Sequence, residues 1–107
     1  MSVTKKQQVL TTVSATFDSE IIELDSFKGY SVGINLSNHS SYTGSVELQI
    51  TNDSDGQWLV VPSSNTALTG DDFHIFDIPA SAASFVKLVV VVTTGDADMK
   101  IDWTLKD

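Results

Sequence analysis

The fold is decided by the stretch FVKLVVVVTTGDADMKIDWTL, residues 85–105. Its first part, residues 85–94, is an apolar and β-branched run that favours a central strand covered on both sides. A Thr-Gly-Asp turn follows at residues 94–96, and apolar residues then alternate with polar ones over residues 98–105. Alternation with a period of two is typical of a strand with one face in the core and one face in water.

The same alternation recurs earlier in the chain, over residues 30–36 and again over residues 46–51. Weaker strand candidates are residues 7–13, 15–24, 57–61 and 73–78. Clusters of Gly, Ser, Asn and Asp, which favour turns, separate these segments. They lie at residues 28–29, 40–44, 52–56, 69–72 and 94–96. Gly33 is different because it lies inside a strand pattern, and it predicts a bulge or a close approach of backbone.

No window shows the sustained apolar period of 3.6 residues that an amphipathic helix needs. Short strands separated by polar turns predict an all-β fold, an antiparallel two-sheet β-sandwich of about eight short strands. Jelly-roll connectivity and immunoglobulin-like connectivity both fit this pattern. The length of 107 residues suits a single domain over residues 1–107.

The composition argues against several functions. The chain has 14 acidic and 6 basic residues, all six of them lysines, and a net charge of −8. This balance argues against nucleic-acid binding and against binding to an anionic membrane surface. The absence of cysteine excludes disulfides and thiolate metal sites. The polar N-terminus is unlike a secretory signal, and the longest apolar run, residues 85–92, is too short to span a bilayer. We therefore expect synthesis in the cytoplasm and no membrane insertion.

The acidic loops raise the question of a metal site. Residues 52–56 look like half of a calcium loop, but Thr51 and Pro62 stand where the EF-hand template requires acidic residues. A looser calcium site would need the acidic turns to meet at one end of the sandwich. Its candidate ligands are Asp53, Asp55, Asp71, Asp72, Asp96 and Asp98. We favour the simpler interpretation that these residues form turns and keep the surface soluble, and we expect no cofactor.

The sequence offers little for catalysis. His39 and His74 are too few and too isolated for a zinc site. Alternation places His74 on the same face as Phe76, which favours a buried residue or a subunit contact, whereas His39 lies in a Ser-rich turn and is expected to be solvated. The chain contains no Gly-x-Ser-x-Gly elbow and no phosphate-binding glycine loop. We therefore expect no enzymatic activity.

Three aromatic residues are candidates for the core or for a binding site. Trp103 belongs to an alternating apolar set and is expected in the core. Trp58 follows a turn and begins a strand, so it could cap the core, which we favour, or stack on a sugar. Tyr42 is expected in a loop, where it would be available to a partner.

Residues 49–58, QITNDSDGQW, carry a family resemblance. A strand that ends in such a turn before a tryptophan resembles small β-sandwich structural proteins of phage virions. The early Tyr-Ser-Val strand at residues 30–32 and the late alternating strand at residues 99–105 are similar to the same family. The resemblance covers roughly residues 20–106 and implies a minor capsid, cement or decoration, or small tail or spike subunit of a bacteriophage. It also implies other virion proteins as partners, a homo-oligomer, and location in the virion.

The Asp-Gly-Trp turn is also similar to one in discoidin-like modules, although those domains are longer and often closed by disulfides. That resemblance implies a small carbohydrate-binding β-sandwich, with calcium as an added option. The ligand would bind at a loop end that contains Trp58, Tyr42 and the acidic turns.

The N-terminal segment differs in charge from the rest of the chain. Residues 1–9 carry Lys5 and Lys6 and no acidic residue. We expect this segment to be an assembly arm that docks on a neighbouring subunit by strand addition or charge pairing. Under this hypothesis, deletion of residues 1–9 abolishes assembly and leaves the fold intact.

Overall fold

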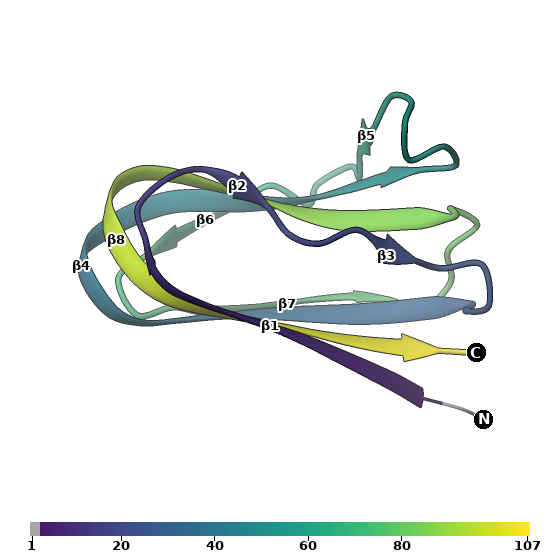
Figure 1. Ribbon diagram of the computed structural model, residues 1–107, viewed down its shortest axis with the longest axis horizontal. Helices are drawn as coiled ribbons and strands as arrows, with labels where there is room; N and C mark the ends of the chain where they lie inside the picture. Colours follow the sequence, from purple (N-terminus) through teal and green to yellow (C-terminus); the bar gives the residue numbers. More distant parts are fainter. Residues whose placement is uncertain (1–2) are drawn as a thin grey trace.

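The computed structural model describes residues 3–107, which form eight antiparallel strands and no helix (Figure 1). The strands are β1 (Val3–Val13), β2 (Phe17–Asp18), β3 (Ile22–Glu23), β4 (Gly29–Thr51), β5 (Leu59–Val60), β6 (Thr66–Thr69), β7 (Phe73–Ile78) and β8 (Phe85–Lys106). The all-β prediction is therefore confirmed. Within the described residues, no helix is long and apolar enough to cross a membrane.

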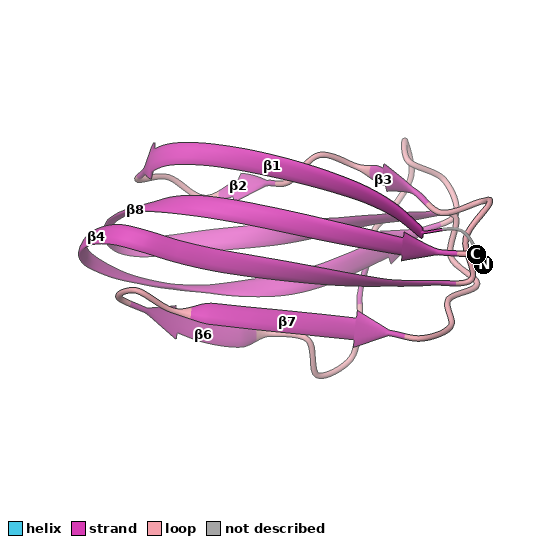
Figure 2. Cartoon of the chain, turned by 90° about the horizontal axis from the view of Figure 1, so that it is seen from below, coloured by secondary structure: helices cyan, strands magenta, loops and turns pink. Residues whose placement is uncertain are grey.

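Two long strands, β4 and β8, organise the molecule. They pair antiparallel over almost their whole length, from Gly29 opposite Lys106 to Thr51 opposite Phe85. Both strands curve back on themselves halfway along, so each contributes to both layers of a sandwich (Figure 1, Figure 2). One layer has the order β1-β8-β4-β7, and in the other β2 and β3 flank β8 while β5 and β6 flank β4. This strand order is that of a jelly roll, so the immunoglobulin-like alternative is wrong.

Two segments that the sequence predicts as turns, residues 40–44 and 94–96, are bends within continuous strands. The β4–β8 register shifts three times between Ser37 and Gly44, and Asn38, Ser41 and Gly95 have φ of 50°, 50° and 71°. Bulges of this kind insert an extra residue and sharpen the bend of a strand. The chain therefore passes from one layer to the other without a turn. In β4 and again in β8, one long strand replaces the two shorter strands that the alternation predicts.

The core contains the alternating apolar residues that the sequence predicts to face inward. Trp103 is fully buried and its ring centroid lies 6.1 Å from that of Tyr30. Burial raises the pKa of Tyr30 to about 12. One expectation is wrong in part: the first half of β8 is central in its layer, but only its inward face is fully buried, whereas Lys87 and Val89 face outward and are half-buried.

Two buried serines close the gaps between the short outer strands. Ser19 lies between β2 and β3, where its backbone N–H donates to Leu88 O at 2.8 Å and its hydroxyl accepts from Leu88 N at 2.9 Å. Ser64 lies between β5 and β6, and its hydroxyl accepts from Leu48 N at 3.1 Å. Leu48 and Leu88 pair directly with each other across β4 and β8. The two hydroxyls therefore satisfy backbone groups that the interrupted outer strands would leave unpaired.

The bend requires glycine at position 95. Gly95 has positive φ, and an added Cβ would overlap the carbonyl oxygens of Ser40 and Ser41. We expect Gly95→Ala to lower the free energy of unfolding by about 2 kcal/mol or more in urea denaturation followed by circular dichroism. Gly33→Ala is the matched control, because an added Cβ there meets its nearest atom at 3.6 Å. Equal stabilities of the two variants would contradict this account of the bend.

Candidate interaction sites

The layer β1-β8-β4-β7 ends in two open edges. Within residues 3–107, no strand pairs with the outer edge of β1 or with that of β7. Both strands also expose apolar side chains on the outer face: Val3 and Val9 are 50% and 65% exposed, and Phe73 and Ile75 are 57% and 53% exposed. An unpaired strand with exposed apolar residues is a template for pairing with another chain.

The segment predicted as an N-terminal arm is a strand of the sheet, because residues 3–9 belong to β1. Its docking on a neighbouring subunit by strand addition or charge pairing stays a prediction. Val3 pairs with Lys106 and Val9 with Lys100, so this segment is hydrogen-bonded to β8 of its own chain. Lys5 and Lys6 are strand residues, with Lys5 on the outer face and Lys6 opposite the inward-facing Trp103. Deletion of residues 1–9 would therefore remove most of a strand from the sheet, not a detachable tail. Met1 and Ser2 lie outside the described residues.

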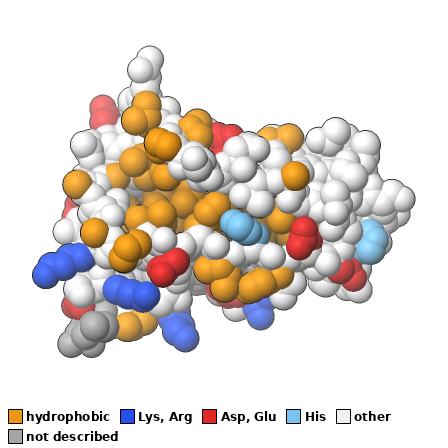
Figure 3. Space-filling view, turned by 180° about the vertical axis from the view of Figure 1, so that it is seen from behind, with side chains coloured by type: hydrophobic (Ala, Val, Ile, Leu, Met, Phe, Trp, Pro, Cys, Tyr) orange, Lys and Arg blue, Asp and Glu red, His pale blue; other side chains and the backbone are white. Residues whose placement is uncertain are grey.

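The strand β7 carries its apolar residues on both faces. Phe73 and Ile75 face outward over Gly33, whose added Cβ would lie 3.6 Å from Ile75 Cγ1 and 3.7 Å from the Phe73 ring. Gly33 is in regular register with Ile75, so the predicted bulge or close backbone approach is wrong; it is side chains that lie close to this glycine. His74 faces inward beside Phe76, with the rings edge to face at 4.5 Å. Figure 3 shows apolar side chains gathered on the face of the molecule that carries β7.

Trp58 lies on the outer surface and not in the core, so the favoured interpretation from the sequence is wrong. The Lys87 ammonium stands 4.5 Å from the centroid of the Trp58 ring and forms an ion pair with Asp18 at 2.8 Å. Lys87 interrupts the apolar run of residues 85–92, and in the strand this position faces outward. An aromatic ring over a lysine accounts for the half-buried state of Trp58, since the cation is attracted to the ring face.

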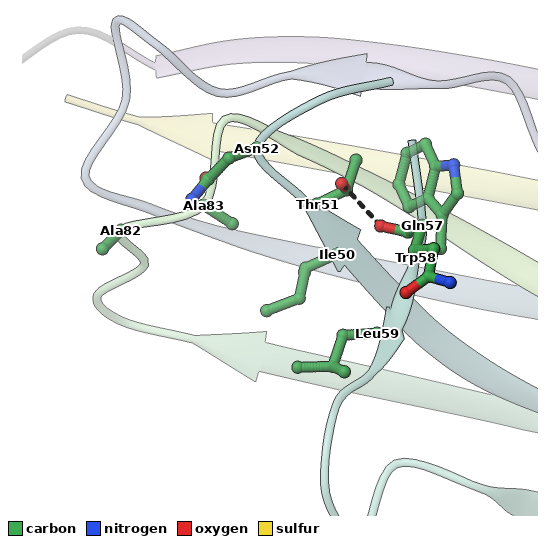
Figure 4. A pocket seen from close by; sticks show the side chains of 8 residues that line it. All are labelled: Ile50, Thr51, Asn52, Gln57, Trp58, Leu59, Ala82 and Ala83. Carbon is green, nitrogen blue, oxygen red and sulfur yellow. Dashed lines mark hydrogen bonds between the residues drawn. The ribbon is translucent and has the colours of Figure 1, made fainter. Parts of the chain in front are cut away.

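A surface pocket of about 440 Å³ lies beside Trp58 (Figure 4). Its lining residues are Ile50, Thr51, Asn52, Gln57, Trp58, Leu59, Ala82 and Ala83. The Thr51 hydroxyl donates to Gln57 O at 2.8 Å and holds the β4–β5 loop closed at the pocket rim. The pocket therefore combines an apolar floor with an indole and two amide side chains.

Tyr42 does not belong to this pocket. It is buried within the bend of β4, and its hydroxyl donates to Val91 O at 3.3 Å. Burial raises the pKa of Tyr42. The expectation of an exposed loop residue is wrong, because the predicted loop is part of a strand and the ring points into the core. Trp58 and Tyr42 therefore do not form one ligand site.

The acidic residues proposed for a looser metal site do not converge. Asp53 and Asp55 lie in the β4–β5 loop, at the end of β4 away from the bend, whereas the other four are near the bend (Figure 1). These four are Asp71, Asp72, Asp96 and Asp98. Among residues 3–107, no group of three or more His, Cys, Asp or Glu side chains is placed to hold a metal ion. The six aspartates therefore do not meet at one end of the sandwich, as the looser site would require, because the second half of β4 separates the two loop regions.

Two of these carboxylates instead hold the bend together. Asp98 accepts hydrogen bonds from Asn38 Nδ2 at 2.9 Å and from the backbone N–H of Thr12 at 2.8 Å. Asp71 lies 2.7 Å from His39 Nδ1, so His39 is paired and not merely solvated. The hydrogen bond from Asn38, followed by that from Thr12, holds the pKa of Asp98 below its usual value. The hydrogen bond from His39 likewise lowers the pKa of Asp71.

The structure resembles solved structures, whereas no protein-family model and no curated protein matches the sequence. The SPBc2 prophage-derived protein YomS has a TM-score of 0.60 at 18% identity, with 97% of this chain and 96% of that chain covered. PirA has a TM-score of 0.62 at 13% identity, with 94% and 92% covered. A structure of Bacillus endospore appendages, described as disulfide-linked pili, has a TM-score of 0.54 at 8% identity, with 98% and 87% covered. At these identities the likeness establishes a shared β-sandwich fold.

The pairing of Asp98 makes the stability of the bend depend on pH. Because the folded state lowers the pKa of this carboxyl, its contribution is complete above the unfolded pKa of about 3.9 and is lost as the pH falls through the folded pKa. We expect Asp98→Ala to lower the melting temperature at pH 7, and the difference from the parent protein to shrink below about pH 4. Asp55→Ala, in the β4–β5 loop, is the control. A difference that stays constant down to pH 2.5 would refute the assignment; thermal denaturation across this pH range measures it.

Proposed function

We propose that this protein is a non-enzymatic structural subunit of a virion, acting through protein–protein contacts in a symmetric homo-oligomeric assembly. Its place would be that of a minor capsid, cement or decoration protein, or of a small tail or spike component, with other virion proteins as partners. The observation that carries the proposal is the layer β1-β8-β4-β7, which ends in two unpaired edges that expose large apolar side chains. Assembly covers such edges and removes them from water.

Three further observations support a structural role with protein partners. The fold is shared with a prophage-derived protein and with an endospore appendage that forms pili. The pocket beside Trp58 has no titratable side chain in its lining, so it offers neither a general acid nor a general base. The net charge of −8 favours protein partners over nucleic acid.

Density-gradient sedimentation of lysate from the native source, with mass spectrometry of each fraction, tests this function. We expect the chain to travel with particles at a fixed ratio to a major shell protein, because a structural subunit is stoichiometric. The ratio would report the symmetry position that the subunit occupies. A chain that stays at the top of the gradient as free protein would refute the virion role.

The pocket favours a second candidate, a small carbohydrate-binding module. The half-buried Trp58 ring next to the amides of Asn52 and Gln57 is a surface on which a sugar could stack and form hydrogen bonds. The virion proposal expects no change in tryptophan fluorescence when glycans or calcium are added. A saturable change that disappears in Trp58→Phe would favour the carbohydrate-binding module instead.

A further inference from the structure

We propose that copies of this chain join head to tail, with the outer edge of β7 in one copy pairing with the outer edge of β1 in the next. This inference rests on the proposed function of an assembly subunit and specifies the contact, which is a second copy of the same chain. The result would be a β-sheet that continues from copy to copy through the layer β1-β8-β4-β7.

Strand direction favours this contact. Each neighbouring pair in the layer is antiparallel, so the four strands alternate in direction from β1 to β7. Because the number of strands is even, a second copy in the same orientation presents its β1 antiparallel to β7 of the first. The inward and outward faces of the two copies also continue without a break, so no rotation of the second copy by 180° is needed.

The register of the layer places complementary residues at its two edges. One row of paired residues runs through Lys5, Thr104, Ser31 and Asp77. Another runs through Val9, Lys100, Asn35 and Phe73. If the next copy joins with no offset along the strands, each row continues into it. Asp77 then meets Lys5 of the next copy, and Phe73 meets its Val9.

These pairs have the chemistry that stabilises neighbouring strands. Lys5 and Asp77 have opposite charges, and Val9 and Phe73 form a β-branched and aromatic pair. All four side chains are exposed on the outer face of the isolated chain. On the inward face, Gln8 of the next copy would stand opposite His74, because Gln8 and His74 end the same row through Ile101.

Charge disfavours the symmetric alternatives. The strand β1 carries Lys5 and Lys6 and no acidic residue, whereas β7 and the loop before it carry Asp71, Asp72 and Asp77 and no lysine. Pairing of β1 with β1 would offer Lys5 and Lys6 no acidic partner, and pairing of β7 with β7 would offer Asp77 no lysine. Only the contact between the lysine-bearing edge of β1 and the aspartate-bearing edge of β7 brings opposite charges together. Such a contact generates a closed ring or an open filament, according to the rotation between copies.

Engineered cysteines test this contact, because the chain has none of its own. The variants are Val9→Cys, Phe73→Cys and the double variant, each oxidised mildly at a concentration where the parent protein self-associates. We expect the double variant to give a ladder of disulfide-linked multimers on a non-reducing gel, and a mixture of the two single variants to give dimers alone. The double variant Val9→Cys with Ala67→Cys is the matched control, since Ala67 lies on β6 in the other layer, and we expect no ladder from it.

Each outcome discriminates. Cross-linking of one single variant with itself would show a symmetric contact and overturn the inference. A double variant without multimers, in a protein that still sediments as an oligomer, would overturn the head-to-tail contact and leave the proposed function standing. A parent protein that is monomeric at every concentration and free of particles in lysate would overturn both.

A charge exchange tests the register. Lys5→Glu and Asp77→Lys should each weaken self-association about fivefold in sedimentation velocity, since each places like charges opposite one another. The variant with both substitutions should recover the parent affinity within about twofold. Lys28→Glu makes the same change of charge outside both strands, and we expect it to leave self-association unchanged. Failure of the paired variant to recover would overturn the proposed register.

Discussion

The antiparallel ladder between β4 and β8 is the interaction on which the rest of the structure depends. These two strands are the central pair of both layers, because each passes from one layer to the other. Within residues 3–107, every other strand pairs with one of them, and none pairs with another outer strand. At the middle of one layer, the Leu48–Leu88 pair is closed on both sides by the hydroxyls of Ser64 and Ser19. The ladder therefore fixes the register of all the outer strands at once.

The bend converts this ladder into a sandwich. Without it, β4 and β8 would form one long, flat two-stranded ribbon with an apolar face that nothing covers. Bulges with positive φ turn both strands together, and Asp98 ties the turned segment to β1 through Thr12 and to β4 through Asn38. Only after the bend do the inward-facing residues of the two halves, such as Val90 and Trp103, belong to one core.

Alternation of apolar and polar residues predicts the long strands well, because one face of each strand lies against the core and the other does not. It fails where that signal is short or interrupted. Tyr42 lies among the bulges, where the period of two breaks and a bend has the same Gly, Ser and Asn composition as a turn. Trp58 precedes a strand of two residues, too short to show which face is inward. The strand β1 reads as a polar arm because Lys6 and Gln8 occupy its inward positions, as is common at sheet edges. The Lys87–Trp58 contact joins residues that are far apart in sequence, and alternation within a single strand does not predict contacts of this kind.

The distribution of lysines gives the sheet its polarity. In a chain of net charge −8, copies repel one another in most orientations. Lys5 and Lys6 lie in β1, and Lys100 and Lys106 lie in the adjacent β8, so four of the six lysines gather at one side of the layer. The acidic β7 edge lies at the other side. An overall repulsion with one attractive pair of edges selects a single approach, and it also protects exposed apolar strands from indiscriminate pairing. Because this selection is electrostatic between exposed groups, added salt should weaken the discrimination before it weakens the fold.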